Sequence, residues 1–309
     1  MGLALATSSS SRTRLLLVAL FLVVILGAGP APSPLGYHRD LPPRRAPARI
    51  VSLAPSVTEM VFALGAGSRL VGVTRFCDVP VEATRLPKVG GFADASLEAI
   101  LGLKPDLVIA VRAEGNRKVA DRLVDLGVPV LVVPGTTLAD VFTALRMIGD
   151  ALNVGDAAGK LRASIQAELD EVRRRVSGLP PTRVLLLYDH RPLIVAGPGS
   201  FGHELLTLAG GDNACVQGAV PYPTMNVEAV IACAPRMILD ASMGGRDDDK
   251  GAQARALFSR YASIPAVREN KVLAIPGGAL MRPGPRVGQD VRTLAMLMHP
   301  EAFATDGGR

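Results

Sequence analysis

Few side chains in this sequence have the type and spacing that catalysis requires. The four histidines are His38, His190, His203 and His299, and the first lies in a proline-rich stretch. Metal-dependent hydrolysis needs clustered histidine and carboxylate ligands, and no HExxH, GxSxG, P-loop or GxGxxG motif is present. A zinc or manganese site lacks its ligand set for the same reason. We therefore expect a protein that is not an enzyme and that holds no resident cofactor or metal.

A glycine-rich segment, GPGSFG at 197–202, superficially resembles a phosphate-binding loop. It lacks the lysine that such a loop carries, and we expect it to form the turn into a helix that begins near His203. Ser200, His203 and Asp189 have neither the order nor the spacing of a catalytic triad. A hydrolase is accordingly the weaker alternative.

The three cysteines cannot all pair with one another. Cys215 and Cys233 lie in the same half of the chain and are candidates for a disulfide in an oxidising compartment, which would leave Cys77 over. No CxxC spacing is present, so the sequence gives no support to a structural zinc site.

One segment of the chain occurs twice. Residues 96–110, SLEAILGLKPDLVIA, are echoed at 226–240, NVEAVIACAPRMILD. Each copy begins with an N-cap residue, carries a glutamate where the helix dipole favours negative charge, and ends its helix at a proline before a strand. A second echo, 127–137 and 270–280, predicts a short buried strand that ends in Pro-Gly. The sequence therefore predicts two related α/β lobes with a ligand site between them.

Strand and helix patterns alternate on both sides of one long helical stretch. In the first series a strand turns at Ala54-Pro55 into a helix capped near Ser56 or Thr58. The later elements of this series are strands at 70–74, 107–111 and 130–133 and helices at 97–103 and 119–126. From Asp156 to Val176 apolar residues recur at three- and four-residue steps among charged ones, and RVLLLYD at 183–189 begins the second series.

The predicted fold class is α/β, with two Rossmann-like lobes, each built on a parallel sheet, joined by a single long backbone helix. The N-terminal lobe is expected at 49–152, the connecting helix at 153–180 and the C-terminal lobe at 181–303. Because a helix is a stiff connector, the lobes should move only modestly against each other.

The N-terminus has the pattern of a secreted protein. Residues 1–29 predict a signal peptide or an uncleaved N-terminal anchor, because arginines precede an apolar run at 15–26. That run is shorter than the roughly 20 residues of a membrane-spanning helix. The proline-rich residues 30–48 predict a flexible linker. The net charge of +6 comes largely from N-terminal arginines, and no basic face with interleaved aromatics indicates nucleic-acid binding.

The segment RIVSLAPSVTEMVFALGAGSRLVGVTRFCDVP at 49–80, followed by SLEAILGLKPDLVIA and a charged helix, resembles a known family. This family is the helical-backbone substrate-binding proteins of ABC importers, or class III periplasmic binding proteins, which carry cobalamin, haem and iron-siderophores. The resemblance extends from Arg49 to Phe303. VGVTRFCDVP, VGGFADASLEAI and the PYP at 221–223 are most similar to the periplasmic cobalamin-binding proteins.

The resemblance implies roles for individual residues. Glu98 and Glu228 would dock on the membrane permease, whereas the alternative is that each merely offsets a helix dipole, by some tenths of a kcal/mol. The side chains that the resemblance places at the ligand cleft are Phe76, Phe92, Val111, His190, Ile194, Tyr222, Met281 and Arg282. Core packing is the alternative for Phe76 and Phe92, but both lie near strand ends, where α/β folds bind ligands.

The chain departs from the cobalamin-binding pattern in its aromatic residues. It contains no tryptophan, and Val111 and Ile194 stand where those proteins can carry an aromatic side chain. His190 or Tyr222 could ligate a haem iron, and a surface or hydrogen-bonded side chain is the alternative for His190. Arg282, in RPGPR at 282–286, could pair with a ligand carboxylate or phosphate or could be solvated. Pro285 is expected in the first turn of the last helix.

Taken with the resemblance, the residues predict a non-catalytic periplasmic or extracytoplasmic receptor. Cobalamin or a related corrinoid is the expected ligand, with haem or a ferric siderophore as the alternative. The expected partners are an ABC permease and its ATPase, and the receptor itself is expected to be a monomer.

Overall fold

The computed structural model of this chain describes residues 46–215, 218–242, 250–275, 280 and 282–308. The predicted signal or anchor segment at 1–29 lies outside these residues, as do most of the linker predicted at 30–48 and Met281. Among the described helices, none combines the length and the apolar character that crossing a bilayer would require.

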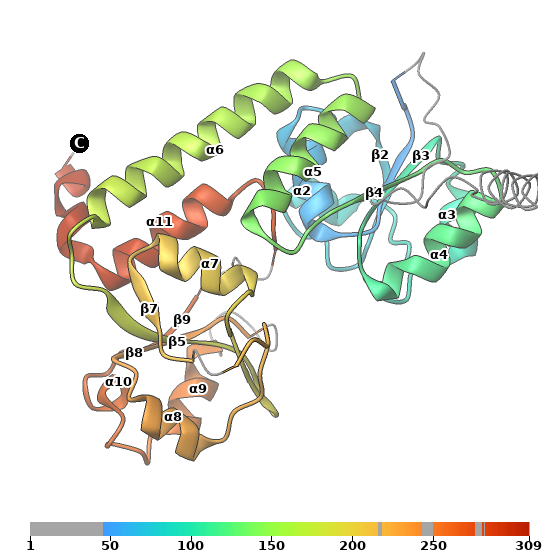
Figure 1. Cartoon of the computed structure of the whole chain (residues 1–309). Helices are drawn as coiled ribbons and strands as arrows, with labels where there is room; N and C mark the ends of the chain where they lie inside the picture. Colours follow the sequence, from blue (N-terminus) through green and yellow to red (C-terminus); the bar gives the residue numbers. More distant parts are fainter. Residues whose placement is uncertain (1–45, 216–217, 243–249, 276–279, 281, 309) are drawn as a thin grey trace, which may run out of the picture. The chain divides into compact units, whose positions relative to one another are not determined.

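The N-terminal lobe is built on a parallel sheet with the strand order β2-β1-β3-β4 (Figure 1). Its strands are β1 (Ile50–Ser52), β2 (Leu70–Val73), β3 (Leu107–Val111) and β4 (Val130–Val133). Its helices are α2 (Pro55–Ala63), α3 (Leu97–Gly102), α4 (Glu114–Asp125) and α5 (Leu138–Ala151), with 3₁₀ turns η1 (Gly67–Arg69) and η2 (Val81–Arg85). Helices α2 and α5 cover one face of the sheet, and α3 and α4 cover the other (Figure 1).

The C-terminal lobe repeats this order and adds one antiparallel strand. The parallel strands follow the order β7-β5-β8-β9, and β6 pairs with the far end of β5. The strands are β5 (Thr182–His190), β6 (Leu193–Val195), β7 (Gly211–Asn213), β8 (Met237–Asp240) and β9 (Val272–Ala274). The helices are α7 (Phe201–Leu208), α8 (Val227–Cys233), α9 (Lys250–Phe258), α10 (Pro265–Arg268) and α11 (Val287–Met298), followed by the 3₁₀ segment η4 (Pro300–Gly308).

The strand register shows that the two sequence echoes occupy equivalent places. Leu107 pairs with the first strand of its lobe as Met237 pairs with the first strand of the other. Val130 on β4 and Val272 on β9 also pair with matching residues of their neighbouring strands. The prediction of two related α/β lobes with parallel sheets is therefore confirmed.

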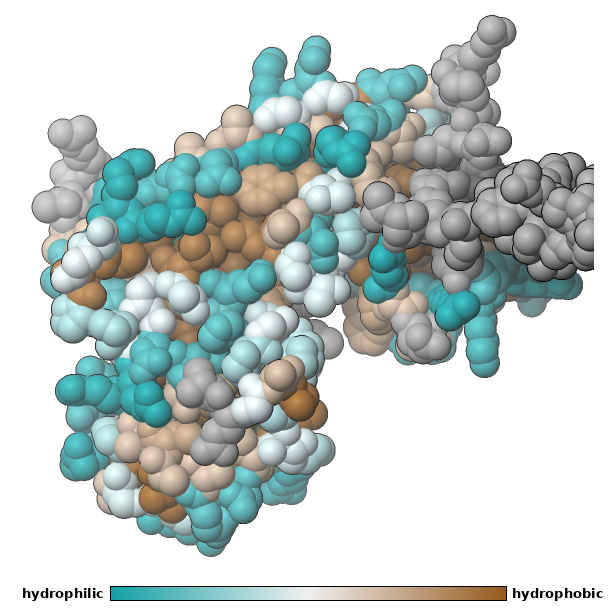
Figure 2. Space-filling view, in the orientation of Figure 1, coloured by the Kyte–Doolittle hydropathy of each residue, from teal (hydrophilic) through white to brown (hydrophobic). Residues whose placement is uncertain are grey.

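The connecting helix α6 (Gly155–Val176) packs against both lobes. The largest buried cluster contains Ile165 and Leu169 of α6 together with Leu145 of α5 and Leu294 of α11. Hydrophilic side chains lie along the outer side of this helix, and apolar surface lies beneath it (Figure 2). Since close-packed interiors resist deformation, this shared core supports the expectation of a stiff connection.

Some predicted helix starts were wrong. Helix α2 begins at Pro55 after Ala54, which makes no side-chain cap, so neither Ser56 nor Thr58 is the cap. Helix α4 begins at Glu114 rather than near residue 119. The prediction missed this start because the charged first turn shows no apolar periodicity. Helix α11 begins after Arg286, so Pro285 precedes the helix instead of lying in its first turn.

Candidate functional site

A pocket of about 980 Å³ lies in the C-terminal lobe. Its lining residues are Tyr188, Asp189, His190, Arg191, Ile194, Tyr222, Ser242, Gln253, Ala256, Leu257 and Arg260. Three of the predicted ligand residues, His190, Ile194 and Tyr222, thus line one pocket. The others lie elsewhere in the chain.

The β5–β6 hairpin forms one wall of this pocket. In the N-terminal lobe the first strand ends at Ser52, and α2 follows almost at once. The equivalent strand β5 continues to His190 and turns back into β6. At the turn the Asp189 carboxylate accepts hydrogen bonds from the backbone N–H groups of His190, at 2.7 Å, and Arg191, at 3.1 Å. The side chain of Asp189 therefore fixes the turn that brings the next residues to the pocket.

His190 is held by a fully buried carboxylate. Its Nε2 lies 2.9 Å from Oδ2 of Asp240, which is 0 % exposed. The other oxygen of Asp240 accepts a hydrogen bond of 3.0 Å from the backbone N–H of Ser242. The hydrogen-bonded alternative for this histidine is what the structure shows. A carboxylate that binds one ring nitrogen also orients the imidazole for a ligand at the other nitrogen.

The metal chemistry open to His190 depends on which other ligand side chains lie near it. Among the residues that the structure describes, no group of three or more histidine, cysteine, aspartate or glutamate side chains could ligate one. A single imidazole can instead serve as an axial ligand for a metal that a macrocycle already chelates. The donor set at His190 therefore fits a metal complex better than a free ion.

Two tyrosines form the aromatic part of the pocket. The rings of Tyr188 and Tyr222 meet edge to face, with centroids 5.4 Å apart and an interplanar angle of 64°. Burial raises the pKa of the Tyr188 hydroxyl far above its usual range, and this hydroxyl donates to the Leu280 carbonyl at 3.4 Å. Tyr188 is therefore a neutral support, while Tyr222 is 48 % exposed at the wall of the pocket.

Polar side chains also line the pocket. The hydroxyl of Ser242 is buried, and it has no hydrogen-bond partner in the part of the chain that the structure describes. Arg191 and Arg260 are exposed and contribute two cations to the lining.

The aromatic residues predicted in the N-terminal lobe are on its surface. Phe76 is 45 % exposed and Phe92 is 36 % exposed, so the core-packing alternative does not describe them. The guanidinium of Arg75 lies 5.0 Å from the ring centroid of Phe76 and is paired with Asp94 at 3.0 Å. Neither phenylalanine lines the pocket of the other lobe.

Val111 belongs to the core of its lobe. The side chain is only 8 % exposed, and a Cβ added at Gly135 would lie 2.7 Å from its Cγ1. The structure thus gives Val111 a packing role and little surface with which to make the predicted ligand contact.

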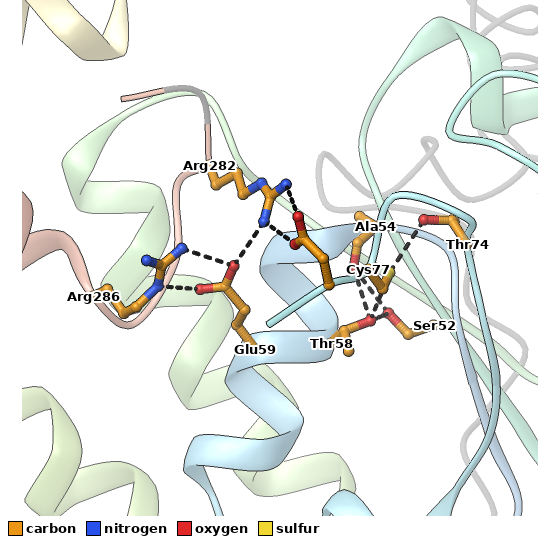
Figure 3. Close-up of polar contacts among 9 residues, drawn as sticks. Ser52, Ala54, Thr58, Glu59, Thr74, Cys77, Arg282 and Arg286 are labelled. Atoms are coloured by element: carbon orange, nitrogen blue, oxygen red, sulfur yellow. Dashed lines mark hydrogen bonds and ion pairs between the residues drawn. The ribbon is translucent and has the colours of Figure 1, made fainter. Parts of the chain in front are cut away.

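Of the two roles considered for Arg282, the structure contradicts the solvated one, and pairing with a ligand remains a prediction. Arg282 is not solvated, because its side chain is 14 % exposed, and its guanidinium pairs within the protein with Asp78 and Glu59 (Figure 3). The prediction of a ligand-binding arginine at this position overlooked carboxylates that are distant in sequence.

The two glutamate helices are alike in local detail. The Ser96 hydroxyl accepts a hydrogen bond from the Ala99 N–H in α3, and the Asn226 side chain accepts one from the Ala229 N–H in α8. Glu98 and Glu228 lie in the first turns, and both are exposed. The two caps were predicted correctly, whereas docking remains a prediction.

The candidate disulfide is not present in the structure. Cys215 and Cys233 are buried, but their sulfur atoms are not bonded to each other. Cys215 follows β7 and packs in a core cluster of the C-terminal lobe, and Cys233 ends α8. Buried thiols of this kind behave as small apolar side chains, so co-location in one lobe was insufficient evidence for a bond.

Sequence reasoning missed Tyr188, Asp240, Ser242 and Arg260. The one usable signal was Asp240, a carboxylate inside the apolar strand MILD, where the other copy of the repeat has Ala110. A charged residue in a buried strand requires a partner, and here the partner is His190.

Two related α/β lobes, one connecting helix and a pocket with an aromatic wall are the architecture of a ligand-binding protein. The family model for periplasmic binding proteins matches residues 50–279. The chain belongs to this family, and the resemblance to its helical-backbone group is confirmed by the relatives and structures that follow.

Similar proteins include binders of two ligands. The vitamin B12-binding protein of Salmonella typhimurium is 32 % identical over 200 residues, which cover 65 % of this chain and 74 % of that protein. The vitamin B12-binding protein of Pectobacterium atrosepticum is 28 % identical over 230 residues, covering 73 % and 81 %. The apo structure of a periplasmic heme-binding protein from Roseiflexus has a TM-score of 0.73 and 30 % identity, covering 82 % of this chain and 98 % of that chain. The vitamin B12-binding protein of Vibrio cholerae has a TM-score of 0.71 and 28 % identity, covering 82 % and 96 %.

Proposed function

We propose that this protein is the substrate-binding protein of an ABC importer and that its cargo is a metal-tetrapyrrole, with cobalamin or a related corrinoid first and haem second. It works outside the cytoplasm as a monomer, after secretion directed by residues 1–29, and it delivers the cargo chemically unchanged to a membrane permease and its ATPase. Nucleic acid plays no part in this role.

The observation that carries the proposal is the pocket of about 980 Å³ with the exposed ring of Tyr222 at its wall. This volume is at the upper end of the range for small-molecule sites, as a tetrapyrrole requires. The exposed rings of Phe92 and Phe76 give the N-terminal lobe apolar surface for a flat ligand.

One observation favours the second ligand. His190, oriented by buried Asp240, has a ring nitrogen left for a metal, and exposed Arg191 and Arg260 could pair with carboxylate arms such as those of haem. The corrin ring instead carries amide arms, with which Ser242 and Gln253 could form hydrogen bonds.

Absorbance titration of the purified mature protein with aquocobalamin and with haemin tests the proposal. We expect saturable one-to-one binding of at least one of them, with a shifted visible spectrum. If neither ligand binds while a ferric siderophore does, the cargo class is wrong. If none of the three binds, the transport proposal itself is contradicted.

We further propose that Glu98 and Glu228 dock on basic residues of the permease. Both are exposed and occupy equivalent positions in the two lobes. Replacing both by alanine should leave ligand affinity unchanged and impair uptake by cells that carry the transporter. The matched control is Glu82→Ala, an exposed first-turn glutamate of η2. A large loss of affinity in the double variant would place these glutamates in the ligand site instead.

A further inference from the structure

The segment RPGPR at 282–286, here called the strap, connects the two lobes without belonging to either sheet. It lies between β9 and α11 in the chain, and α11 packs in the shared core. Its two arginines nevertheless pair with residues of the N-terminal lobe (Figure 3). Pro283 and Pro285 restrict the backbone of the strap, because each fixes its own φ.

The first pairing is between Arg286 and Glu59 of α2. Arg286 Nε donates to Glu59 Oε2 at 2.8 Å, and a second guanidinium nitrogen donates to Oε1 at 3.1 Å. Arg282 adds a third contact to the same carboxylate at 3.5 Å. Glu59 is only 4 % exposed, so its charge depends on these arginines for compensation.

The second pairing joins Arg282 to Asp78 in the loop after β2. A guanidinium nitrogen lies 3.2 Å from Asp78 Oδ2, and the other carboxylate oxygen is also bonded. Partial burial raises the pKa of Asp78, but the hydrogen bond and charge of Arg282 outweigh it and hold this pKa below its usual value. The strap therefore binds the N-terminal lobe through two carboxylates, those of Glu59 and Asp78.

The loop that carries Asp78 is itself fastened to α2. Cys77 Sγ and the Ser52 hydroxyl lie 3.1 and 2.8 Å from the Thr58 hydroxyl (Figure 3). The Thr74 hydroxyl lies 3.1 Å from the same sulfur. Glu59 and Asp78 therefore lie on segments that are hydrogen-bonded to each other, so a displacement of either arginine would act on both segments of the N-terminal lobe.

The charges in this cluster balance when Asp290 is neutral. Arg282 and Arg286 face Glu59 from α2 and Asp78 from the loop, and Asp290 lies in the first turn of α11. Burial raises the pKa of Asp290 to about 7; Arg286 opposes the rise and Glu59 adds to it. The two arginines and the carboxylates of Glu59 and Asp78 then form a charge-balanced network of ion pairs between the lobes.

We propose that Arg282 and Arg286 are positioning residues for ligand binding, because the strap forms a second connection between the lobes beside α6 and keeps the two halves of the site at one separation. A hinge with one connector can bend, whereas two connections at different places restrict bending. The consequence for ligand rests on the proposed function. The consequence for lobe separation does not, and it can be measured without ligand.

Pulsed electron-electron distance measurements between spin labels test the lobe claim. The native cysteines are buried, and labels can be placed at Arg122→Cys on α4 and Arg268→Cys on α10, both highly exposed. The unsubstituted strap should give one narrow distance distribution. Arg282→Gln combined with Arg286→Gln should broaden or shift it, and the matched control Arg174→Gln, on the outer side of α6, should not.

The same variants separate positioning from stability alone. We expect the double variant to melt cooperatively and to raise the dissociation constant for aquocobalamin, or for haemin where that is the compound that binds, by about fivefold or more. Arg286→Lys keeps the charge at this position. In place of Arg286→Gln in the double variant, it should restore part of the narrow distance distribution. If the double variant does not fold, Asp78→Asn provides the milder disruption, because Asp78 is well exposed.

A distance distribution that stays narrow in the double variant, or in Asp78→Asn where that variant replaces it, overturns the proposal even if the protein melts earlier. Broadening with unchanged affinity would also overturn the positioning role, because the lobes would then move without consequence for the site. Absence of any ligand, by contrast, would contradict the proposed function and leave the distance result intact.

Discussion

The two lobes share one frame and differ at the ends of their strands. Both have the same order of parallel strands, and both place a capped glutamate helix before the third strand. In the N-terminal lobe the strand ends lead to exposed Phe76 and Phe92. In the C-terminal lobe an added hairpin, whose His190 is hydrogen-bonded to buried Asp240, forms one wall of a pocket with aromatic and polar lining residues. The two lobes thus share their packing and differ in the side chains that follow the ends of their strands.

The difference is sharpest at one pair of equivalent positions. Ala110 in β3 and Asp240 in β8 are both 0 % exposed. The carboxylate is tolerated only in the lobe that supplies a histidine and a backbone N–H to bind it. Exchanging these two residue types between the lobes should therefore be costly in both directions.

The largest expected effect is that of Ala110→Asp. A carboxylate at this position in β3 would be buried in the apolar core without the partners that Asp240 has. We expect the free energy of unfolding to fall by about 4 kcal/mol, measured by urea denaturation. Ala110→Val, which adds volume without charge, is the control for crowding. A cost for Ala110→Asp no larger than that of Ala110→Val would contradict the contrast between the lobes.

A smaller loss is expected for Asp240→Ala, which makes the C-terminal lobe resemble the other at this position. His190 and the N–H of Ser242 would lose their partner, at a cost of about 2–3 kcal/mol in unfolding free energy. Asp240→Asn, which keeps an acceptor, should cost less. Asp212→Ala, which removes an exposed ion pair with Arg183, should cost under about 1 kcal/mol. Equal losses at 212 and 240 would show that burial does not matter here.

The smallest effect concerns a feature that the lobes share. Lys104 and Ala234 have left-handed backbone angles, φ 47° and φ 46°, at matching places before Pro105 and Pro235. Glycine adopts this conformation without strain, so Lys104→Gly and Ala234→Gly should each raise stability by about 0.5–1 kcal/mol. Thermal melts of both variants measure the gain. A gain in only one lobe would mean that the equivalence of these turns is superficial.

The frame was predictable from sequence because local pattern and burial agree in it. The buried apolar runs 107–111 and 130–133 were predicted with the bounds that the structure shows. The pocket was harder to predict from sequence, because its residues come together only when segments that are distant in sequence pack against each other. Nothing local indicates that β5 turns back into β6, that His190 is the partner of Asp240, or that Arg282 meets a carboxylate of α2. Outside an apolar strand, a charged residue with a distant partner cannot be distinguished in sequence from a solvated one.

The most direct test of a cargo held by both lobes is calorimetric titration of variants that each remove one exposed ring. Phe92→Ala in the N-terminal lobe and Tyr222→Ala in the C-terminal lobe should each weaken ligand binding by about 1–3 kcal/mol, because each side chain is partly exposed, 36 % and 48 %, and its ring can pack on a ligand. Leu126→Ala, an exposed apolar residue at the end of α4, should have no effect on affinity. Weaker binding in both ring variants, with one ligand bound per protein, is the predicted result. Unchanged affinity in either ring variant would contradict a ligand shared between the two lobes.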